Sequence, residues 1–123
     1  MRHYRVTLDD VIAAHEEALS YGGLAGILSL PGIESAIGRP YSGYHRPIAR
    51  KAAALLESLA QNHGFVDGNK RTALLVTLLM IDRSGYHIIL EPEERIDDIV
   101  VNVADGKMAF DALSVWFRSH LGK

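Results

Sequence analysis

The residues best suited to chemistry lie in one short stretch, NHGFVDGNKRTALL, at positions 62–75. It places His63, Asp67 and two adjacent cations, Lys70 and Arg71, around a glycine–asparagine turn. If a helix begins at this turn, its first backbone N–H groups have no partner within the helix and can bind an anion. The helix dipole alone favours acids in a first turn, so two cations there indicate that an anion is expected.

Most residues of this stretch also have a plain structural explanation. Asp67 suits a helix N-cap, a role worth about 1 kcal/mol, which is the favoured explanation for this residue taken alone, and it also suits a Mg²⁺ ligand beside phosphates. His63 is either a favourable charge at the end of a preceding helix or a general base. We expect Phe65 to bury its ring and so fix the loop. Gly68 lets a phosphate approach the backbone closely, and Asn69 offers an amide donor.

Two other kinds of site that share some of these residue types are not supported. The string GNKRT lacks the upstream glycine and the preceding strand of a nucleotide-binding P-loop. The histidines at 3, 15, 45, 63, 87 and 120 include no i, i+4 pair and have no cysteine partner, so a zinc site is not expected.

The composition predicts one compact domain spanning 1–123. Hydrophobic residues make up 48% and charged residues 23% of the chain, which is ordinary for a globular protein with one core. The formal net charge of -2 gives no case for nucleic-acid binding. The absence of cysteine removes disulfides and thiol catalysis and fits a reducing compartment.

Neither a membrane span nor a secretory signal is expected. The longest apolar run, at 73–81, is interrupted by Thr77 and is far shorter than the roughly 20 residues that a membrane span needs. The N-terminal segment MRHYRVTLDD lacks the apolar region of a signal peptide. We therefore expect no membrane partner and a cytoplasmic location.

Helices must position the 62–75 stretch. Thr7 and Asp10 resemble a capping box, and apolar spacing predicts a helix from Leu8 to the glycines at 22–23. Further helices are predicted at 32–38, 48–62, 67–84, from Pro92 onward and at 108–121. The string ALLVTLLMI is apolar nearly all round, which is typical of a central buried helix. Short strands at 2–6 and 86–90 are expected to pair. The segment 40–47 is expected to form a turn at the surface, and its residues 40–46 to contact a target peptide. The predicted fold is an all-α bundle with at most a two-stranded ribbon.

The residues at 63–71, HGFVDGNKR, match every specified position of H-x-F-x-[DN]-[AG]-N-K-R. This is the Doc (death-on-curing) form of the Fic/Doc signature, and the chain resembles that family. The resemblance extends to YGGLAG at 21–26, PGIESAIGRP at 31–40, KAAALLESLAQNH at 51–63 and RTALL at 71–75. It implies a small α-helical Fic/Doc fold. One departure is Leu28-Ser29, where many relatives carry an arginine and an aspartate.

The resemblance implies a phosphotransferase that uses ATP and Mg²⁺. The AMP-transferring branch carries a glycine after the asparagine and a later arginine, whereas here Lys70 follows the asparagine and Leu74, three residues after Arg71, stands where that arginine would be. The Doc-like branch moves the γ-phosphate to a serine or threonine hydroxyl. By position, His63 takes the hydroxyl proton, Asp67 holds Mg²⁺, Gly68 and Asn69 cradle phosphate, and Lys70 and Arg71 neutralise charge, in keeping with what phosphoryl transfer requires.

The resemblance further implies a toxin that arrests translation, with elongation factor Tu as its protein substrate. The inhibitory string [ST]-x-x-x-E-[GN] of other Fic proteins does not occur in this sequence. A separate chain is therefore the expected inhibitor, as in toxin–antitoxin pairs, through a disordered tail that folds on binding. Two alternatives stay open at this point. One is a nucleotidyltransferase of the Fic type, and the other is a non-catalytic interaction module with the same fold.

Overall fold

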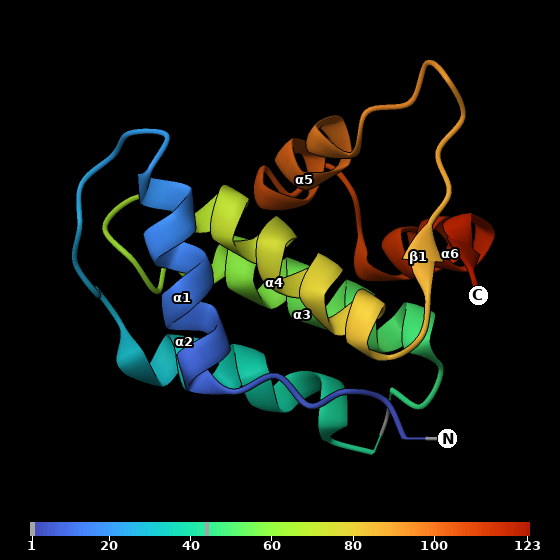
Figure 1. The fold of residues 1–123 in the computed structure, drawn as a ribbon, viewed down its shortest axis with the longest axis horizontal. Coiled ribbons are helices and arrows are strands. Elements are labelled where there is room, and N and C mark those ends of the chain that lie inside the picture. Colours follow the sequence, from blue (N-terminus) through green and yellow to red (C-terminus); the bar gives the residue numbers. More distant parts are fainter. Residues whose placement is uncertain (1, 44) are drawn as a thin grey trace.

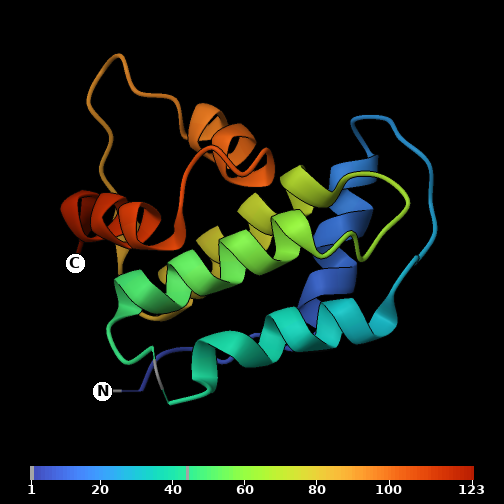
Figure 2. The ribbon, with the colours of Figure 1, turned by 180° about the vertical axis from the view of Figure 1, so that it is seen from behind.

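The computed structural model describes residues 2–43 and 45–123, and its arrangement is shown in Figures 1 and 2. The elements are α1 (Leu8–Leu19), α2 (Leu30–Gly38), the 3-10 helix η1 (Arg39–Tyr41), α3 (Ile48–Gln61), α4 (Asn69–Arg83), β1 (His87–Ile88), α5 (Ile96–Ala104), α6 (Phe110–His120) and β2 (Leu121–Gly122). This confirms the predicted all-α fold with a two-stranded ribbon. Within the described residues, no helix is both long and apolar enough to cross a membrane.

Helices α3 and α4 form an antiparallel pair at the centre, with the other helices packed around them (Figures 1 and 2). The sequence pointed to 67–84 as the central helix, but α3 is the more buried of the two. Ten of its 14 residues are buried, against six of 15 in α4. Alanines such as Ala52 and Ala53 allow close packing on several sides of α3. Leucines such as Leu74 and Leu75 on α4 stay half-buried.

The start of α1 confirms the capping box predicted from Thr7 and Asp10. The Thr7 hydroxyl accepts from the Asp10 backbone N–H at 3.1 Å, and the Asp10 carboxylate accepts from the Thr7 N–H at 2.9 Å. The same carboxylate accepts from the Tyr4 hydroxyl at 2.7 Å. These bonds set the helix entry together with the chain that leads into it. Similarly, Ser29 caps α2, which therefore begins earlier than the predicted residue 32.

The predicted pairing of residues 2–6 with 86–90 is wrong. Strand β1 pairs antiparallel with β2, in the register His87 opposite Gly122 and Ile88 opposite Leu121. Residues 2–6 form no strand. A backbone N–H of this segment is bonded to a side chain and not to a neighbouring strand: Tyr4 N–H donates to the Ser84 hydroxyl at 2.9 Å. The N-terminal segment is thus held without a ladder.

The predicted start of the helix near Pro92 needs correction. The helix predicted from Pro92 onward does not begin there, because Pro92 lies in an exposed turn closed by the bond from Glu94 N–H to Glu91 O at 3.0 Å. Helix α5 begins at Ile96, and the acids of its first turn are Asp97 and Asp98.

The segment 40–47 is not merely a surface turn. Pro40 is buried, and the Tyr41 hydroxyl accepts from the Val6 N–H at 3.1 Å and donates to the Tyr4 carbonyl. Tyr44 lies outside the described residues. The segment leads into the start of α3, whereas the 62–75 stretch follows its end. The two segments therefore flank opposite ends of α3, and contact of the 40–47 segment with a target stays a prediction.

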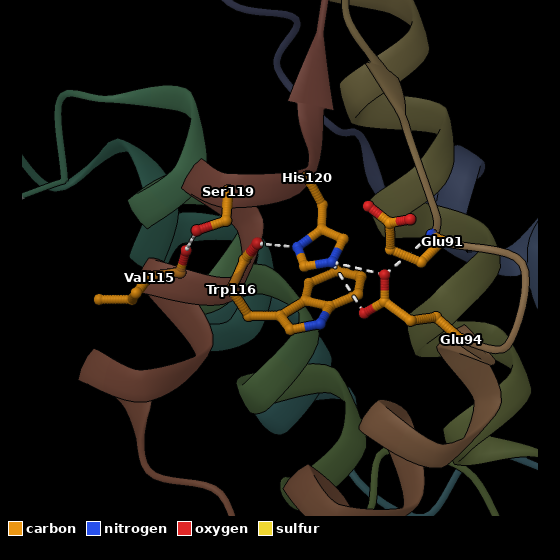
Figure 3. A network of polar contacts seen from close by, with 6 residues as sticks. All are labelled: Glu91, Glu94, Val115, Trp116, Ser119 and His120. Atoms are coloured by element: carbon orange, nitrogen blue, oxygen red, sulfur yellow. Dashed lines mark hydrogen bonds and ion pairs between the residues drawn. The ribbon is translucent and has the colours of Figure 1, made fainter.

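A polar network closes the C-terminal end of the fold (Figure 3). The His120 ring donates from Nδ1 to the Trp116 carbonyl at 2.7 Å and lies 2.8 Å from the Glu94 carboxylate through Nε2. It also stacks on the Trp116 indole, with ring centroids 4.1 Å apart. This network ties the α4–α5 connection to the end of α6. It thereby holds β2 in place to pair with β1.

Replacement of Glu94 by glutamine is expected to lower the melting temperature at neutral pH. The Glu91 backbone N–H and then His120 lower the pKa of the Glu94 carboxyl from its ordinary value of 4.5. Such a group stabilises the fold above its unfolded-state pKa and loses that contribution as pH falls through its folded-state pKa. The difference between wild type and Glu94→Gln should therefore shrink as pH falls below 4.5.

Thermal unfolding monitored by circular dichroism across this pH range is the measurement. Glu93→Gln is the matched control, because Glu93 is the exposed neighbour of Glu94 and carries the same charge. A difference for Glu94→Gln that stays constant from neutral pH to well below pH 4.5 would contradict the assigned ion pair.

Candidate functional site

The loop between α3 and α4 is shaped by two residues with left-handed backbone. His63 has φ 49°, directly after the helix-ending Asn62, and Gly68 has φ 79° as the N-cap of α4. Left-handed backbone after a helix usually falls on glycine, because a side chain makes it unfavourable. A histidine at this position is therefore held in place by the rest of the loop. The chain reverses direction between these two residues.

Phe65 anchors the middle of the loop, as the sequence predicted. Its ring is 2% exposed and stacks on the His15 ring, with centroids 3.7 Å apart. Its backbone is bracketed by Asn69, whose Oδ1 accepts from Phe65 N–H at 3.0 Å and whose Nδ2 donates to Phe65 O at 2.9 Å. The sequence marked Asn69 as a phosphate donor. In the structure its amide holds the loop, and one Nδ2 hydrogen remains for a ligand.

A second extended segment lies along the loop. The Gly64 carbonyl accepts from the N–H groups of Leu28 and Ser29 at 2.8 and 3.1 Å, and Val66 N–H donates to Gly26 O at 2.9 Å. A Cβ at Gly64 would collide with the Ile33 side chain, so the close approach requires glycine. The two residues that depart from the family pattern, Leu28 and Ser29, thus have structural roles in this chain.

Asp67 is not the N-cap that the sequence suggested. Gly68 is the cap residue, and no side chain caps the helix. The Asp67 carboxylate accepts from the Gly68 N–H at 2.9 Å through Oδ1 and from the Leu24 N–H at 3.3 Å through Oδ2. Each carboxylate oxygen keeps a lone pair, so the side chain is oriented yet still able to bind a cation.

The donor set around Asp67 fits Mg²⁺ only in a particular form. Within residues 2–43 and 45–123, no group of three or more acidic or histidine side chains could hold a metal ion. Mg²⁺ is commonly bound through one or two carboxylates together with substrate phosphates and water. The single carboxylate of Asp67 therefore suits a Mg²⁺ ion that is also coordinated by phosphates.

The start of α4 leaves backbone donors available. The first bond across this end runs from Thr72 N–H to Gly68 O at 2.9 Å, so the N–H groups of Asn69, Lys70 and Arg71 precede it. The first turn contains no acid. Unpaired N–H groups and two cations together give this end a positive potential, which favours a bound anion.

All six predicted site residues line one cleft of about 600 Å³, namely His63, Asp67, Gly68, Asn69, Lys70 and Arg71. The facing wall comes from α5, including Asp97 and Val101, and from Asp105, the residue that follows its end. The volume lies within the range of small-molecule sites. The cleft thus has a cationic wall on α4 and, facing it, one acid on α5 and one at the end of that helix.

Arg71 has an additional interaction that the sequence did not reveal. Its Nη1 donates to the Ala18 carbonyl at 3.4 Å, and its guanidinium lies 4.8 Å from the centre of the Tyr21 ring. Arg71 therefore also ties the start of α4 to the end of α1. A cation is favourable beside the last carbonyls of a helix.

His15 is the site residue that sequence reasoning missed. It is 6% exposed on α1, and its Nε2 donates to the Asp67 carbonyl at 2.9 Å while its ring stacks on Phe65. A Cβ at Gly68 would lie 3.6 Å from the same ring. The available signal was a histidine at an apolar position of an amphipathic helix. It acts on the loop as a positioning residue.

Replacement of His15 by phenylalanine should loosen the loop without unfolding the protein. Phenylalanine keeps an aromatic ring against Phe65 but cannot donate to the Asp67 carbonyl, a loss of about 0.5–1.5 kcal/mol. We expect faster hydrogen exchange at residues 65–68 and a lower unfolding midpoint in denaturant. The control is Glu16→Gln on the exposed side of α1. Unchanged exchange in His15→Phe would show that the bond does not position the loop.

Comparison with known proteins agrees with these features. A family model described as the Fic/DOC family matches residues 5–81. The chain is 32% identical over 127 residues to "Protein kinase doc" of Escherichia phage P1, and the alignment covers 99% of this chain and 98% of that protein. It is 30% identical over 112 residues to "Toxin Doc" of Mycolicibacterium smegmatis (strain ATCC 700084 / mc(2)155), with coverage of 86% and 85%. The chain therefore belongs to the Fic/Doc family and is Doc-like.

Proposed function

We propose that this protein transfers the γ-phosphate of ATP to a serine or threonine hydroxyl of a target protein. The observation that carries the proposal is that an imidazole and a cationic helix start open into one cleft. His63 lies at the start of the loop and Gly68 at its end, as the N-cap of α4, and both line that cleft. Phosphoryl transfer requires this combination of positioning and charge stabilisation.

The residues have separate roles in the proposed reaction. The N–H groups at the start of α4, with Lys70 and Arg71, bind the phosphates and stabilise charge on the transferring group. Asp67, together with the phosphates, would hold Mg²⁺, which would supply further charge neutralisation. The target oxygen forms a bond to the γ-phosphorus as the bond to the bridging β-oxygen breaks, and ADP leaves. The hydroxyl proton passes to the imidazole of His63.

Transfer of the γ-phosphate is favoured over nucleotidyl transfer by the next turn of α4. Leu74 lines the cleft one turn beyond Arg71. An apolar side chain there offers no charge where the AMP-transferring branch carries an arginine. The name of one relative, "Protein kinase doc", agrees with this choice.

The cellular role that fits this activity is that of a toxin held in check by an antitoxin. One relative is named as a toxin. The resemblance points to elongation factor Tu as the protein substrate and to arrest of translation as the consequence. The antitoxin would be a separate chain whose disordered tail folds against the domain.

His63→Gly is expected to lose activity while the fold is preserved or stabilised. Glycine suits the left-handed backbone at this position, so we expect a gain in stability of up to about 1 kcal/mol. Loss of a general base lowers the transfer rate by about 10²–10⁴-fold. Denaturant unfolding measures the first effect, and single-turnover phosphate transfer measures the second.

His63→Ala provides the comparison in cells. It removes the imidazole and keeps a side chain on the same backbone. If bacterial growth arrest persists with this variant, the protein acts by binding and not by catalysis.

ATP labelled at different phosphates distinguishes the two transfer reactions. With γ-labelled ATP we expect label on the target, and with α-labelled ATP we expect none. Purified elongation factor Tu is the first substrate to test, with an unrelated protein as the control. Label transferred from the α position would overturn the kinase proposal in favour of nucleotidyl transfer.

A further inference from the structure

A second cleft lies at the other end of the α3–α4 pair. It has a volume of about 400 Å³. We name it the basic cleft, because its lining includes Arg2, Arg5, Arg46 and Lys51 together with His3 and His45. Lys51 lies in the first turn of α3 and His63 follows its last turn, so the two clefts are separated by roughly 20 Å of helix. Figure 1 shows that the dark-blue segment leading into α1 begins at the end opposite the start of α4.

The cations of the basic cleft have no internal counter-ions. Within residues 2–43 and 45–123, none of its three arginines and one lysine forms an ion pair, and no acid lines the cleft. The chain as a whole carries a net charge of -2. A local gathering of positive charge in a hollow raises the local concentration of anions.

Some of these groups are already held in position. Lys51 Nζ donates to His3 Nδ1 at 2.9 Å. Burial, followed by the charge of Lys51, lowers the pKa of His3, and burial lowers the pKa of Lys51. Arg5 lies 4.8 Å from the centre of the Tyr41 ring, on its face. Because the Tyr41 hydroxyl is bonded to the chain at residues 4 and 6, the floor of the cleft is fixed.

His45, another residue of the basic cleft, has a ring nitrogen without a partner in the described part of the chain. Its Nδ1 is buried and has no hydrogen-bond partner among the described residues, and its ring packs on Phe110 with centroids 5.1 Å apart. Buried polar atoms without partners are unusual and call for an explanation such as a ligand or an ordered water. The adjoining start of α3 also has no side-chain cap, and its first turn contains no acid.

From these observations we infer that the basic cleft binds a small polyphosphate group, at a site separate from the catalytic cleft. Three arginines and a lysine match the charge of a di- or triphosphate, and guanidinium groups suit phosphate oxygens in particular. Nucleic acid fits less well, because single strands are usually held by stacking of bases on free aromatic rings. The Tyr41 ring is instead approached by Arg5 and Lys51.

The test is calorimetric titration of the whole protein with inorganic tripolyphosphate in the absence of Mg²⁺. The variant is Arg2→Ala with Arg46→Ala, because both side chains are exposed and neither has a hydrogen-bond partner within the described chain. We expect its affinity to fall about tenfold or more, as for the loss of charged donors. The matched control is Lys107→Ala with Arg118→Ala, which removes the same charge from other exposed positions and should bind normally.

Amide chemical shifts recorded during the titration locate the binding. Changes at residues 3–6 and 45–51 support the proposal, and changes confined to 63–72 assign the anion to the catalytic cleft and overturn it. The titration is then repeated with ATP. If ATP changes the same amide shifts, the ligand is a nucleotide; if only tripolyphosphate changes them, the ligand is an inorganic polyphosphate. The proposal also fails if no binding occurs at millimolar concentration, if the control loses equal affinity, or if a short single-stranded RNA binds more tightly.

Discussion

The pair of hydrogen bonds between the Asn69 side chain and the Phe65 backbone is the constraint on which the site depends. These bonds fix the loop relative to the first residue of α4. With Phe65 buried, the loop cannot shift without opening the core. The imidazole of His63 and the carboxylate of Asp67 are therefore held on either side of one anchor. A site built in this way needs little reorganisation when a ligand binds.

Helix α1 has a positioning role although it lies far from the motif in the sequence. It contributes the His15 ring against Phe65 and a bond to the Asp67 carbonyl, and its last turn accepts from Arg71. The capping box at Thr7 holds the other end of the helix. The motif is thus supported from both sides, by α1 and by the extended segment at 26–29.

Net charge is a poor guide to what this molecule binds, because its charges are segregated. One group of cations surrounds the start of α4, and the other gathers near the start of α3 at the opposite end. Acids, including Asp67 and Asp97, share the cleft of the first group, whereas no acid among the described residues lines the second cleft. Only the distribution of charge on the folded surface produces fields that attract anions.

The sequence by itself determined the features that depend on near neighbours. Helix periodicity, the capping box at Thr7 and the nine-residue motif at 63–71 all involve residues within a turn or two of each other, and the structure contains all of them. The same patterns marked Phe65 as the anchor of the loop. The family resemblance rests on this local information.

The tertiary structure alone decided which distant segments meet. Ribbon pairing went to residues 121–122 and not to 2–6, because the side chains of Ser84 and Tyr41 bind the N-terminal backbone. Asp67 bonds Leu24, and His15 reaches the loop, across more than forty intervening residues. Such contacts depend on the packing of whole helices, which no local pattern specifies.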